Sequence, residues 1–187
     1  MSHFIDVQIS IDPEFTVNQL LAALYAKLHR VLSQQRITTI GVAFPGYNGR
    51  APHLGRCLRL FGPADDLLRL MAQNWLTGLR DHVTVSEVTT IPVNITHRTL
   101  RRVQAKSSPE RLRRRLVRRH SITEKQAYEQ IPDTAAERLQ LPFIKLKSSS
   151  NGRTFYLYLR LGEPLPEMIA GSFNAYGLSS DATVPWF

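Results

Sequence analysis

The chain has 187 residues, of which 43% are hydrophobic, so it can form one domain or two small ones around an ample core. Its formal net charge of +9 favours a polyanionic partner, and its single cysteine, Cys57, excludes a disulfide framework and a cage of thiolate metal ligands. The sequence shows neither a secretory signal nor an apolar run of membrane-spanning length, so we expect a cytoplasmic protein without a membrane partner.

Six elements are predicted in the first 92 residues. Isoleucine or valine at every second position from 5 to 11 predicts a strand over 4–11. Thr16 and Gln19 form a capping box for a helix from 17 to about 33, and a second helix is predicted over 63–79. Further strands are predicted over 37–44, 56–61 and 83–91.

The order strand, helix, strand, strand, helix, strand predicts a ferredoxin-like sandwich over residues 1–94, a framework shared by many RNA-recognition modules. The predicted strands lack the Lys/Arg-Gly-aromatic signature with which such modules stack bases. We therefore expect nucleic-acid recognition to lie elsewhere in the chain.

The stretch 98–119 holds ten Lys or Arg residues and one acid, Glu110, and so carries the whole excess charge. The stretch 107–110, with two serines, a proline and an acid, supplies an N-cap serine and a first helical turn, and predicts a helix from there to about 120. At 100° per residue, one side of this helix carries Arg111, Arg114, Arg115 and Arg118, while the opposite side carries Leu112, Leu116 and Val117. The helix thus has one side to bury and one side suited to phosphates.

The remainder predicts a smaller α+β domain over 95–187 that contains this arginine-rich helix and a β-hairpin. Ser121 and Glu124 form a capping box for a helix to about 130, and a helical turn is predicted over 134–139. Strands over 143–148 and 154–161 are joined through a turn with an Asn-Gly pair, the strongest short signal for a hairpin. A final strand region is predicted over 172–187. The predicted fold class of the whole chain is α+β.

The sequence contains neither a metal-binding motif nor a glycine-rich phosphate loop, so it predicts no metal site and no cofactor. Three residues draw notice. His29 flanks the apolar stripe of the first helix, Ser148 ends a strand before a turn, and Tyr176 lies between two small residues. Each of these is more often a structural residue than a catalytic one, and sequence physics alone does not join them into a site.

A resemblance joins them. Residues 102–120, RVQAKSSPERLRRRLVRRH, resemble the arginine-rich helix of the type I-F CRISPR repeat-processing endoribonuclease. Further similar pieces lie at 12–15, 27–29, 131–134, 141–143, 176–179 and 184–187, so the resemblance spans the chain. It implies an RNA enzyme that cuts CRISPR repeat RNA at the 3′ base of a short hairpin, without metal and by attack of a 2′-hydroxyl. It also implies that the enzyme keeps the cut hairpin, the end of the mature guide RNA, within a surveillance complex with other subunits.

The resemblance also implies catalytic roles. His29 would match the family histidine, Ser148 the serine that holds the attacking 2′-hydroxyl, and Tyr176 the tyrosine that orients the histidine. These residue types suit the reaction, because attack by an internal 2′-hydroxyl needs a proton shuttle near neutrality and a group that fixes the nucleophile in line.

The resemblance also implies RNA-binding residues. Arg102 and Gln104 would match the pair that reads base edges at the foot of the stem, and Phe155 the aromatic residue that stacks under the terminal base pair. The predicted RNA-binding set is completed by Lys106, Ser107, Arg111, Arg114, Arg115, Arg118, Arg119 and Ser150. Side chains normally do not fit the major groove of A-form RNA, but a short stem with open ends relaxes that limit.

Other interpretations fit part of the sequence. One is a non-catalytic subunit of a CRISPR complex, defensive or transposon-associated, that binds hairpin RNA while His29 and Ser148 are structural. A second is a DNA-binding protein with the arginine-rich helix in a B-form major groove. A solvated basic helix or a binder of acidic lipids is the third, although the apolar side of the helix has no aromatic residue for a lipid surface.

Overall fold

The computed structural model describes residues 1–104, 109–132, 139–148 and 152–187. Contacts between residues divide the chain into two compact units, one of residues 1–103 with 141–187 and one of residues 104–140. The domain boundary predicted between residues 94 and 95 concerns folding domains and stays a prediction. Among the described helices, none is both long and apolar enough to cross a membrane.

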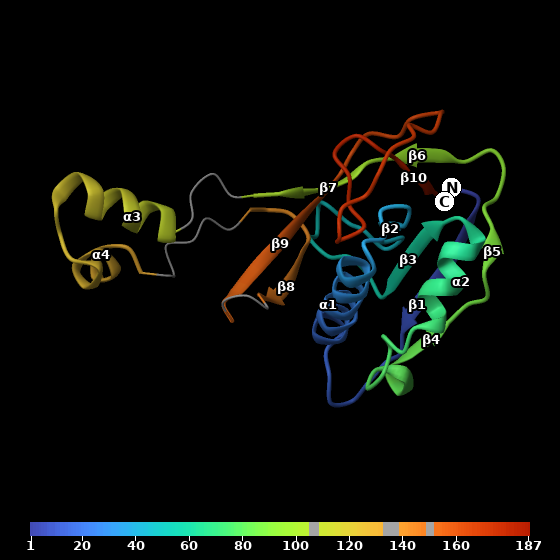
Figure 1. Cartoon of the computed structure of the whole chain (residues 1–187), viewed down its shortest axis with the longest axis horizontal. Coiled ribbons are helices and arrows are strands. Elements are labelled where there is room, and N and C mark those ends of the chain that lie inside the picture. The colour runs from blue at the N-terminus through green and yellow to red at the C-terminus, as the bar shows by residue number, and fades with distance from the viewer. Residues whose placement is uncertain (105–108, 133–138, 149–151) are drawn as a thin grey trace. The chain divides into compact units, whose positions relative to one another are not determined.

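The first unit contains an antiparallel sheet with the strand order β2-β3-β1-β4, and β5 also pairs with β1 (Figure 1). Its strands are β1 (His3–Ile9), β2 (Gly41–Ala43), β3 (Cys57–Gly62), β4 (Val83–Val85) and β5 (Thr89–Thr90). Along β1, Ile5, Val7 and Ile9 are buried and their neighbours are not, as the alternating sequence predicts.

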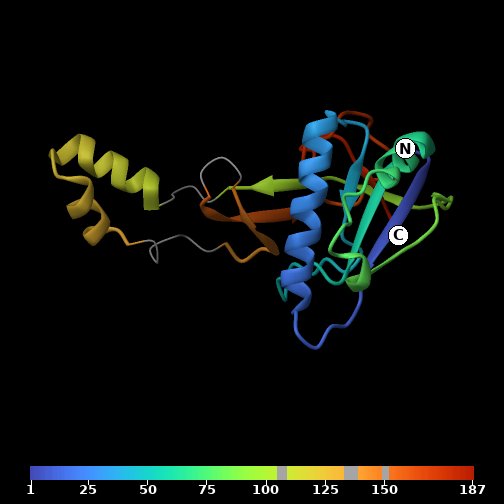
Figure 2. The same cartoon turned by 60° about the horizontal axis from the view of Figure 1, so that its bottom comes forward.

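Two helices cover this sheet. Helix α1 (Val17–Gln35) begins at the predicted capping box, in which Thr16 and Gln19 bond to each other's backbone amides. It runs lengthwise along the sheet (Figure 2) and contacts β1, while α2 (Ala64–Ala72) contacts β1 and β3. The leucines of α1 and the apolar residues of the strands form one continuous core.

Three predicted elements are shorter than expected. The helix predicted over 63–79 ends at Ala72 because Gln73 is extended, and the chain continues in turns to the 3-10 helix η1 (Arg80–His82). The strand predicted over 83–91 is interrupted between β4 and β5, where the hydroxyl of Ser86 accepts a hydrogen bond from the amide of Asp6. The strand predicted over 37–44 is confined to β2.

The first unit also holds a three-stranded antiparallel sheet of order β7-β9-β8 and the antiparallel pair β10-β6. These strands are β6 (Thr96–Arg98), β7 (Leu100–Val103), β8 (Phe143–Lys147), β9 (Thr154–Leu161) and β10 (Val184–Trp186). The predicted hairpin is confirmed as β8 and β9. The strand region predicted over 172–187 is reduced to β10, because residues 174–178 form a turn that Asn174 closes.

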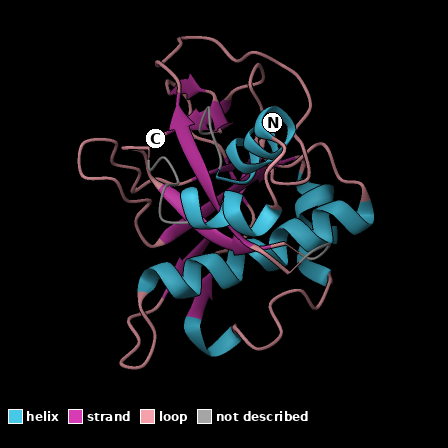
Figure 3. Ribbon diagram, turned by 90° about the vertical axis from the view of Figure 1, so that its left-hand side faces the viewer, coloured by secondary structure: helices cyan, strands magenta, loops and turns pink. Residues whose placement is uncertain are grey.

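The second unit contains α3 (Pro109–His120) and α4 (Glu124–Gln130). Ser107 and Ser108, one of which is the predicted N-cap of α3, lie outside the described residues, as does nearly all of the helical turn predicted over 134–139. The capping box of α4 is Thr123 with Gln126, not Ser121 with Glu124, because Ser121 adopts a left-handed conformation between the two helices. With four described α-helices and several antiparallel sheets, the predicted α+β class is confirmed (Figure 3).

Candidate active site

The imidazole of His29 stacks on the phenol ring of Tyr176. Their ring centroids lie 3.8 Å apart and their planes are inclined by 4°. His29 belongs to the second half of α1, and Tyr176 lies in the turn of residues 174–178 near the end of the chain. Both side chains are half-buried. The structure therefore brings together two of the three predicted catalytic residues.

A hydrogen bond to the carbonyl oxygen of Ala175 fixes the tautomer of His29. Its Nδ1 lies 2.9 Å from the carbonyl oxygen of Ala175, and since a carbonyl oxygen only accepts, Nδ1 carries the proton and donates. Neutral His29 therefore has its lone pair on Nε2, which makes Nε2 the atom able to take or give a proton.

Tyr25 braces this pair from the same side of α1, four residues before His29. Its hydroxyl donates to the carbonyl oxygen of Tyr176 over 2.7 Å, and the two tyrosine rings stack with centroids 6.2 Å apart. Complete burial raises the pKa of Tyr25 well above its ordinary value, and the neighbouring Tyr176 adds to this effect. Tyr25 therefore stays a neutral donor.

The turn that presents Tyr176 is closed by Asn174. Its Oδ1 accepts hydrogen bonds from the amides of Tyr176, over 2.8 Å, and Leu178, over 3.3 Å. Gly177 takes a φ of +68°, and its carbonyl accepts a hydrogen bond of 2.9 Å from the amide of Val42 in β2. The turn is thereby tied to the sheet, and the sheet fixes where Tyr176 meets His29.

Ser148 directly follows β8, and β8 packs against α1, the helix that carries His29. Its backbone amide donates to the carbonyl of Arg153 over 2.8 Å, which continues the pairing of the hairpin by one residue. The half-buried side chain of Ser148 thus lies at the end of the hairpin.

Arg102 and Phe155, both predicted to bind RNA, come together in the sheet β7-β9-β8. The guanidinium carbon of Arg102 lies 5.6 Å from the centroid of the Phe155 ring, within the range of a cation–π contact. Arg102 is exposed at the end of β7, and Phe155 is half-buried near the start of β9. Gln104, also exposed, follows β7 by one residue and begins the second unit.

The arginines of α3 divide as predicted. Arg111, Arg114, Arg115, Arg118 and Arg119 are exposed, while Leu112, Leu116 and Val117 are half-buried. Arg114 contacts Glu110 at 3.6 Å. Lys106, Ser107 and Ser150 lie outside the described residues. Within the described ranges, no group of three or more His, Cys, Asp or Glu residues is arranged to hold a metal ion.

Arg113 is the exception on α3, and the sequence reasoning missed it. Its Nη1 donates to the carbonyl of Ile131 over 2.8 Å, and its guanidinium lies 4.5 Å from the ring centroid of Tyr128. It is half-buried and ties α3 to the end of α4. In a run of identical side chains, only the helical phase, which places 113 beside 112, 116 and 117, signals this inward position.

Comparisons with known proteins cover the whole chain. A family model described as CRISPR-associated protein (Cas_Csy4) matches residues 4–187. The chain is 46% identical over 187 residues to the CRISPR-associated endonuclease Cas6/Csy4 of Pseudomonas aeruginosa (strain UCBPP-PA14), with 100% of both chains covered. It is 44% identical over 187 residues, again with 100% of both chains covered, to the protein of the same name from Escherichia coli (strain UTI89 / UPEC).

Proposed function

The chain belongs to the Cas_Csy4 family of CRISPR-associated proteins, and from this premise we propose that it is an endoribonuclease that cuts CRISPR repeat RNA at the 3′ base of a hairpin. Membership confirms the resemblance found in the sequence to the type I-F repeat-processing enzyme. The two relatives are named as endonucleases over a length equal to that of this chain.

The observation that carries the proposal is the stacked pair of His29 and Tyr176. Two contacts set the position of the imidazole, the stack at 3.8 Å and the hydrogen bond to Ala175 at 2.9 Å, and both leave Nε2 available. This arrangement leaves Nε2 of His29 outside the contacts that position the ring. A general acid–base catalyst needs such a histidine.

In the proposed reaction, the 2′-hydroxyl of the nucleotide before the scissile bond attacks the adjacent phosphorus. The bond from phosphorus to the 5′-oxygen of the next nucleotide breaks, and a 2′,3′-cyclic phosphate remains on the upstream product. Nε2 of His29 either takes the proton of the 2′-hydroxyl or, when protonated, gives a proton to the leaving 5′-oxygen. Water supplies the other proton transfer: it gives a proton to the leaving 5′-oxygen in the first case and takes the proton of the 2′-hydroxyl in the second. Neither transfer is assigned to a metal ion, so the proposed reaction is independent of metal.

Ser148 would hold the attacking 2′-hydroxyl in line with the leaving oxygen. Its place at the end of the hairpin, on the strand that packs against α1, supports this role. Tyr176 would orient the imidazole, which the near-parallel stack supports.

Binding is proposed to use two groups of residues. Arg102 and Gln104 would read base edges at the foot of the stem, and Phe155 would stack under the terminal base pair, which the contact of Arg102 with Phe155 supports. The exposed arginines of α3, namely Arg111, Arg114, Arg115, Arg118 and Arg119, would contact phosphates along the stem. Lys106, Ser107 and Ser150 are proposed to complete these contacts.

We further propose a ferredoxin-like fold for the first half of the chain. The antiparallel strand order β2-β3-β1-β4, with α1 and α2 following β1 and β3, supports it. We also propose that the protein stays on the cut hairpin as one subunit of a type I-F surveillance complex, so that its product is its lasting ligand.

A repeat hairpin with one deoxynucleotide before the scissile phosphate tests the proposal. It lacks the attacking atom but keeps nearly every phosphate contact, so it should bind as tightly as the all-ribose hairpin and stay whole. Cleavage of the all-ribose hairpin should continue in EDTA. Cleavage of the deoxy hairpin at the normal rate would exclude 2′-hydroxyl attack.

His29→Ala should slow cleavage on the order of 10²- to 10⁴-fold while the dissociation constant of the hairpin stays within a few-fold of wild type. His53→Ala, which removes an exposed histidine from a loop, is the matched control and should cut at the wild-type rate. If the wild-type protein binds the hairpin but never cuts it, the protein is a non-catalytic binding subunit. If duplex DNA at the same concentration as the hairpin displaces the hairpin, the arginine-rich helix is a DNA-binding element.

A further inference from the structure

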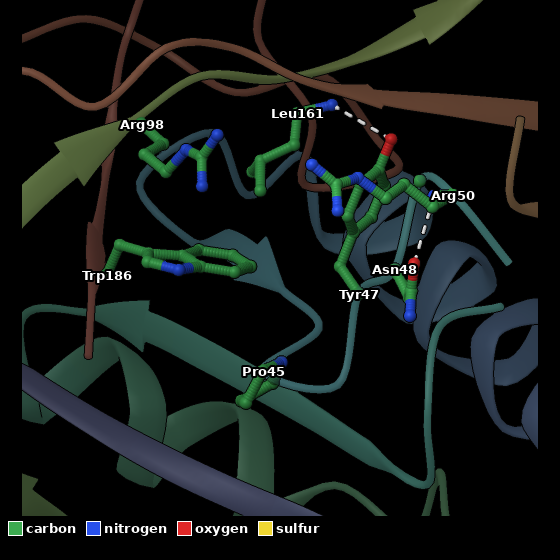
Figure 4. Close-up of a pocket in the computed structure, with 8 residues that line it drawn as sticks. Pro45, Tyr47, Asn48, Arg50, Arg98, Leu161 and Trp186 are labelled. Carbon is green, nitrogen blue, oxygen red and sulfur yellow. Dashed lines mark hydrogen bonds between the residues drawn. The ribbon is translucent and has the colours of Figure 1, made fainter. Parts of the chain in front are cut away.

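The first unit contains a cavity that the proposed reaction does not use. This cavity, of about 560 Å³, is lined by residues of the loop 45–50 and by Arg98 of β6, Leu161 of β9 and Trp186 of β10. Neither His29 nor Tyr176 is among the described residues that line it. Figure 4 shows Arg98 and Trp186 at one end of the cavity and Tyr47 and Arg50 at the other.

The cavity carries positive charge. Arg98 donates from Nε to the carbonyl of Gly162 over 2.7 Å, which fixes its guanidinium above the Trp186 indole. Arg50 is exposed, and no described residue bonds its guanidinium. No acidic residue occurs among the described lining residues, so the cavity attracts an anion. The guanidinium groups of its two arginines carry paired N–H donors that match the geometry of a phosphate group.

The cavity also has rigid aromatic walls. The guanidinium carbon of Arg98 lies 5.5 Å from the centroid of the Trp186 ring, whose strand β10 is held by pairing with β6. The hydroxyl of Tyr47 donates to the carbonyl of Leu159 over 3.3 Å and accepts from the amide of Leu161 over 3.4 Å. These contacts fix both rings before any ligand arrives, so little side-chain freedom is lost on binding.

Guanidinium groups beside aromatic rings suit one class of ligand, a nucleotide, whose phosphate pairs with arginine while its base stacks on an aromatic ring. An acidic peptide would satisfy the arginines, but its carboxylates offer no planar ring to stack on the aromatic walls. We propose that this cavity binds a nucleotide of the single-stranded RNA that flanks the repeat hairpin. This inference rests on the proposed function.

Strand β9 links the cavity to the proposed foot of the stem. Phe155, proposed to stack under the terminal base pair, lies near its start, and Leu161, which lines the cavity, is its last residue. Six steps along a strand, at about 3.3 Å each, span about 20 Å. A flank that leaves the foot of the stem reaches the cavity after a few nucleotides, and both positions belong to the same sheet within the first unit.

Tryptophan fluorescence tests the ligand class directly. The chain has two tryptophans, and Trp75 is 7% exposed and outside this cavity, so a Trp75→Phe variant reports on Trp186 alone. An oligouridylate of about six nucleotides, a length within the range of known single-strand sites, should quench this fluorescence. Penta-glutamate should not. Quenching by penta-glutamate and not by the oligouridylate would overturn the proposal in favour of an acidic protein segment.

Hairpins with and without single-stranded flanks test the same cavity in the unmodified protein. Wild type should bind a hairpin with a flank of about six nucleotides about tenfold more tightly than a hairpin without flanks. Arg50→Ala should remove this advantage and leave the binding and cutting of the flankless hairpin unchanged. Arg56→Ala, an exposed arginine outside the cavity, is the matched control and should keep the advantage.

Separate 5′ and 3′ flanks identify the side from which the nucleotide comes. If neither flank adds affinity, or if Arg50→Ala keeps the full advantage, the cavity does not bind RNA and the proposal is wrong. Failure of the proposed function is distinguishable, because it would appear as loss of cutting or binding of the flankless hairpin by wild type.

Discussion

We propose that Asn174 is a positioning residue that acts through Tyr176. Replacing it with alanine removes the acceptor of two backbone amides, which should lower the free energy of unfolding by about 1–3 kcal/mol, measured by urea denaturation. The looser turn should also slow single-turnover cleavage by up to about 100-fold while hairpin affinity stays unchanged. Asn174→Asp keeps an acceptor oxygen and should restore most of the rate. Equal rates for the alanine variant and wild type would show that the turn does not position the ring.

Gly177 tests the same turn through the backbone. An added Cβ would lie 2.5 Å from Cγ1 of Val42, and the φ of +68° is costly for any other residue. Gly177→Ala should therefore destabilise the protein by about 1–3 kcal/mol, seen as a lower denaturation midpoint. Gly49→Ala is the control, since its nearest neighbour would be 3.6 Å away. Equal midpoints for the two variants would contradict the predicted strain.

Arg101 and Arg102 form a matched pair at the proposed foot of the stem. Both are exposed, but they are adjacent in β7 and so point to opposite faces of the sheet. Arg102→Ala should reduce discrimination between the repeat hairpin and one with its terminal base pair swapped by about 1–3 kcal/mol, measured as a ratio of dissociation constants. Arg101→Ala should leave that ratio intact. If both hairpins lose affinity equally in Arg102→Ala, this residue contacts only phosphate.

For single residues of the candidate site, the sequence predicted some positions and missed others. The roles of His29 and Tyr176 came from the resemblance, and the structure brings their rings together, but their catalytic roles stay predictions. Nothing in the sequence indicated that Tyr25 supports the pair of His29 and Tyr176, because a tyrosine among leucines is typical of a core residue. Asn174 was equally hidden, since an asparagine that accepts a hydrogen bond from the backbone amide two residues later has the same sequence pattern as an ordinary turn.

Helix α3 carries both arginines proposed to bind RNA and one arginine, Arg113, that contacts Ile131 and Tyr128. Arg115→Ala should lower the slope of log affinity against log salt by roughly 0.7–0.9, if one phosphate contact is lost, and leave the melting temperature unchanged. Arg113→Ala removes the same charge from the same helix but breaks the contacts with Ile131 and Tyr128. It should lower the thermal stability of this unit, measured by circular dichroism. An unchanged salt slope in Arg115→Ala would move the binding face elsewhere.

Elements with strong local signals were predicted well. The capping box of α1 and the hairpin β8–β9 depend on residues close in sequence, and both are confirmed. Strand β7 was not predicted because Arg101 and Arg102 interrupt its apolar alternation, and its pairing with β9 is a contact distant in sequence. The end of α2 at Ala72 was missed because Trp75, Leu76 and Leu79 are buried at roughly helical spacing without being helical.

The two units differ in how much core each has. Among the described residues of 104–140, Ala127 is the only buried one, whereas the first unit has a continuous core. Backbone amides of α3 and α4 should therefore exchange with deuterium at least about tenfold faster than those of α1, a difference in opening free energy of about 1.4 kcal/mol or more. Hairpin RNA should slow the exchange in α3 by binding its folded state. Equal protection of all three helices without RNA would contradict this prediction.

The separation of His29 from Ala175 by 146 residues sets an order of events during synthesis. Helix α3 is held by contacts close in sequence, so it can form soon after residue 120 leaves the ribosome. The stacked pair of His29 and Tyr176 cannot form until the last part of the chain has emerged. A nascent chain thus acquires its proposed surface for RNA before its proposed means of cutting, and a message truncated before codon 174 would yield a protein that still carries α3 but has lost the partner of its histidine.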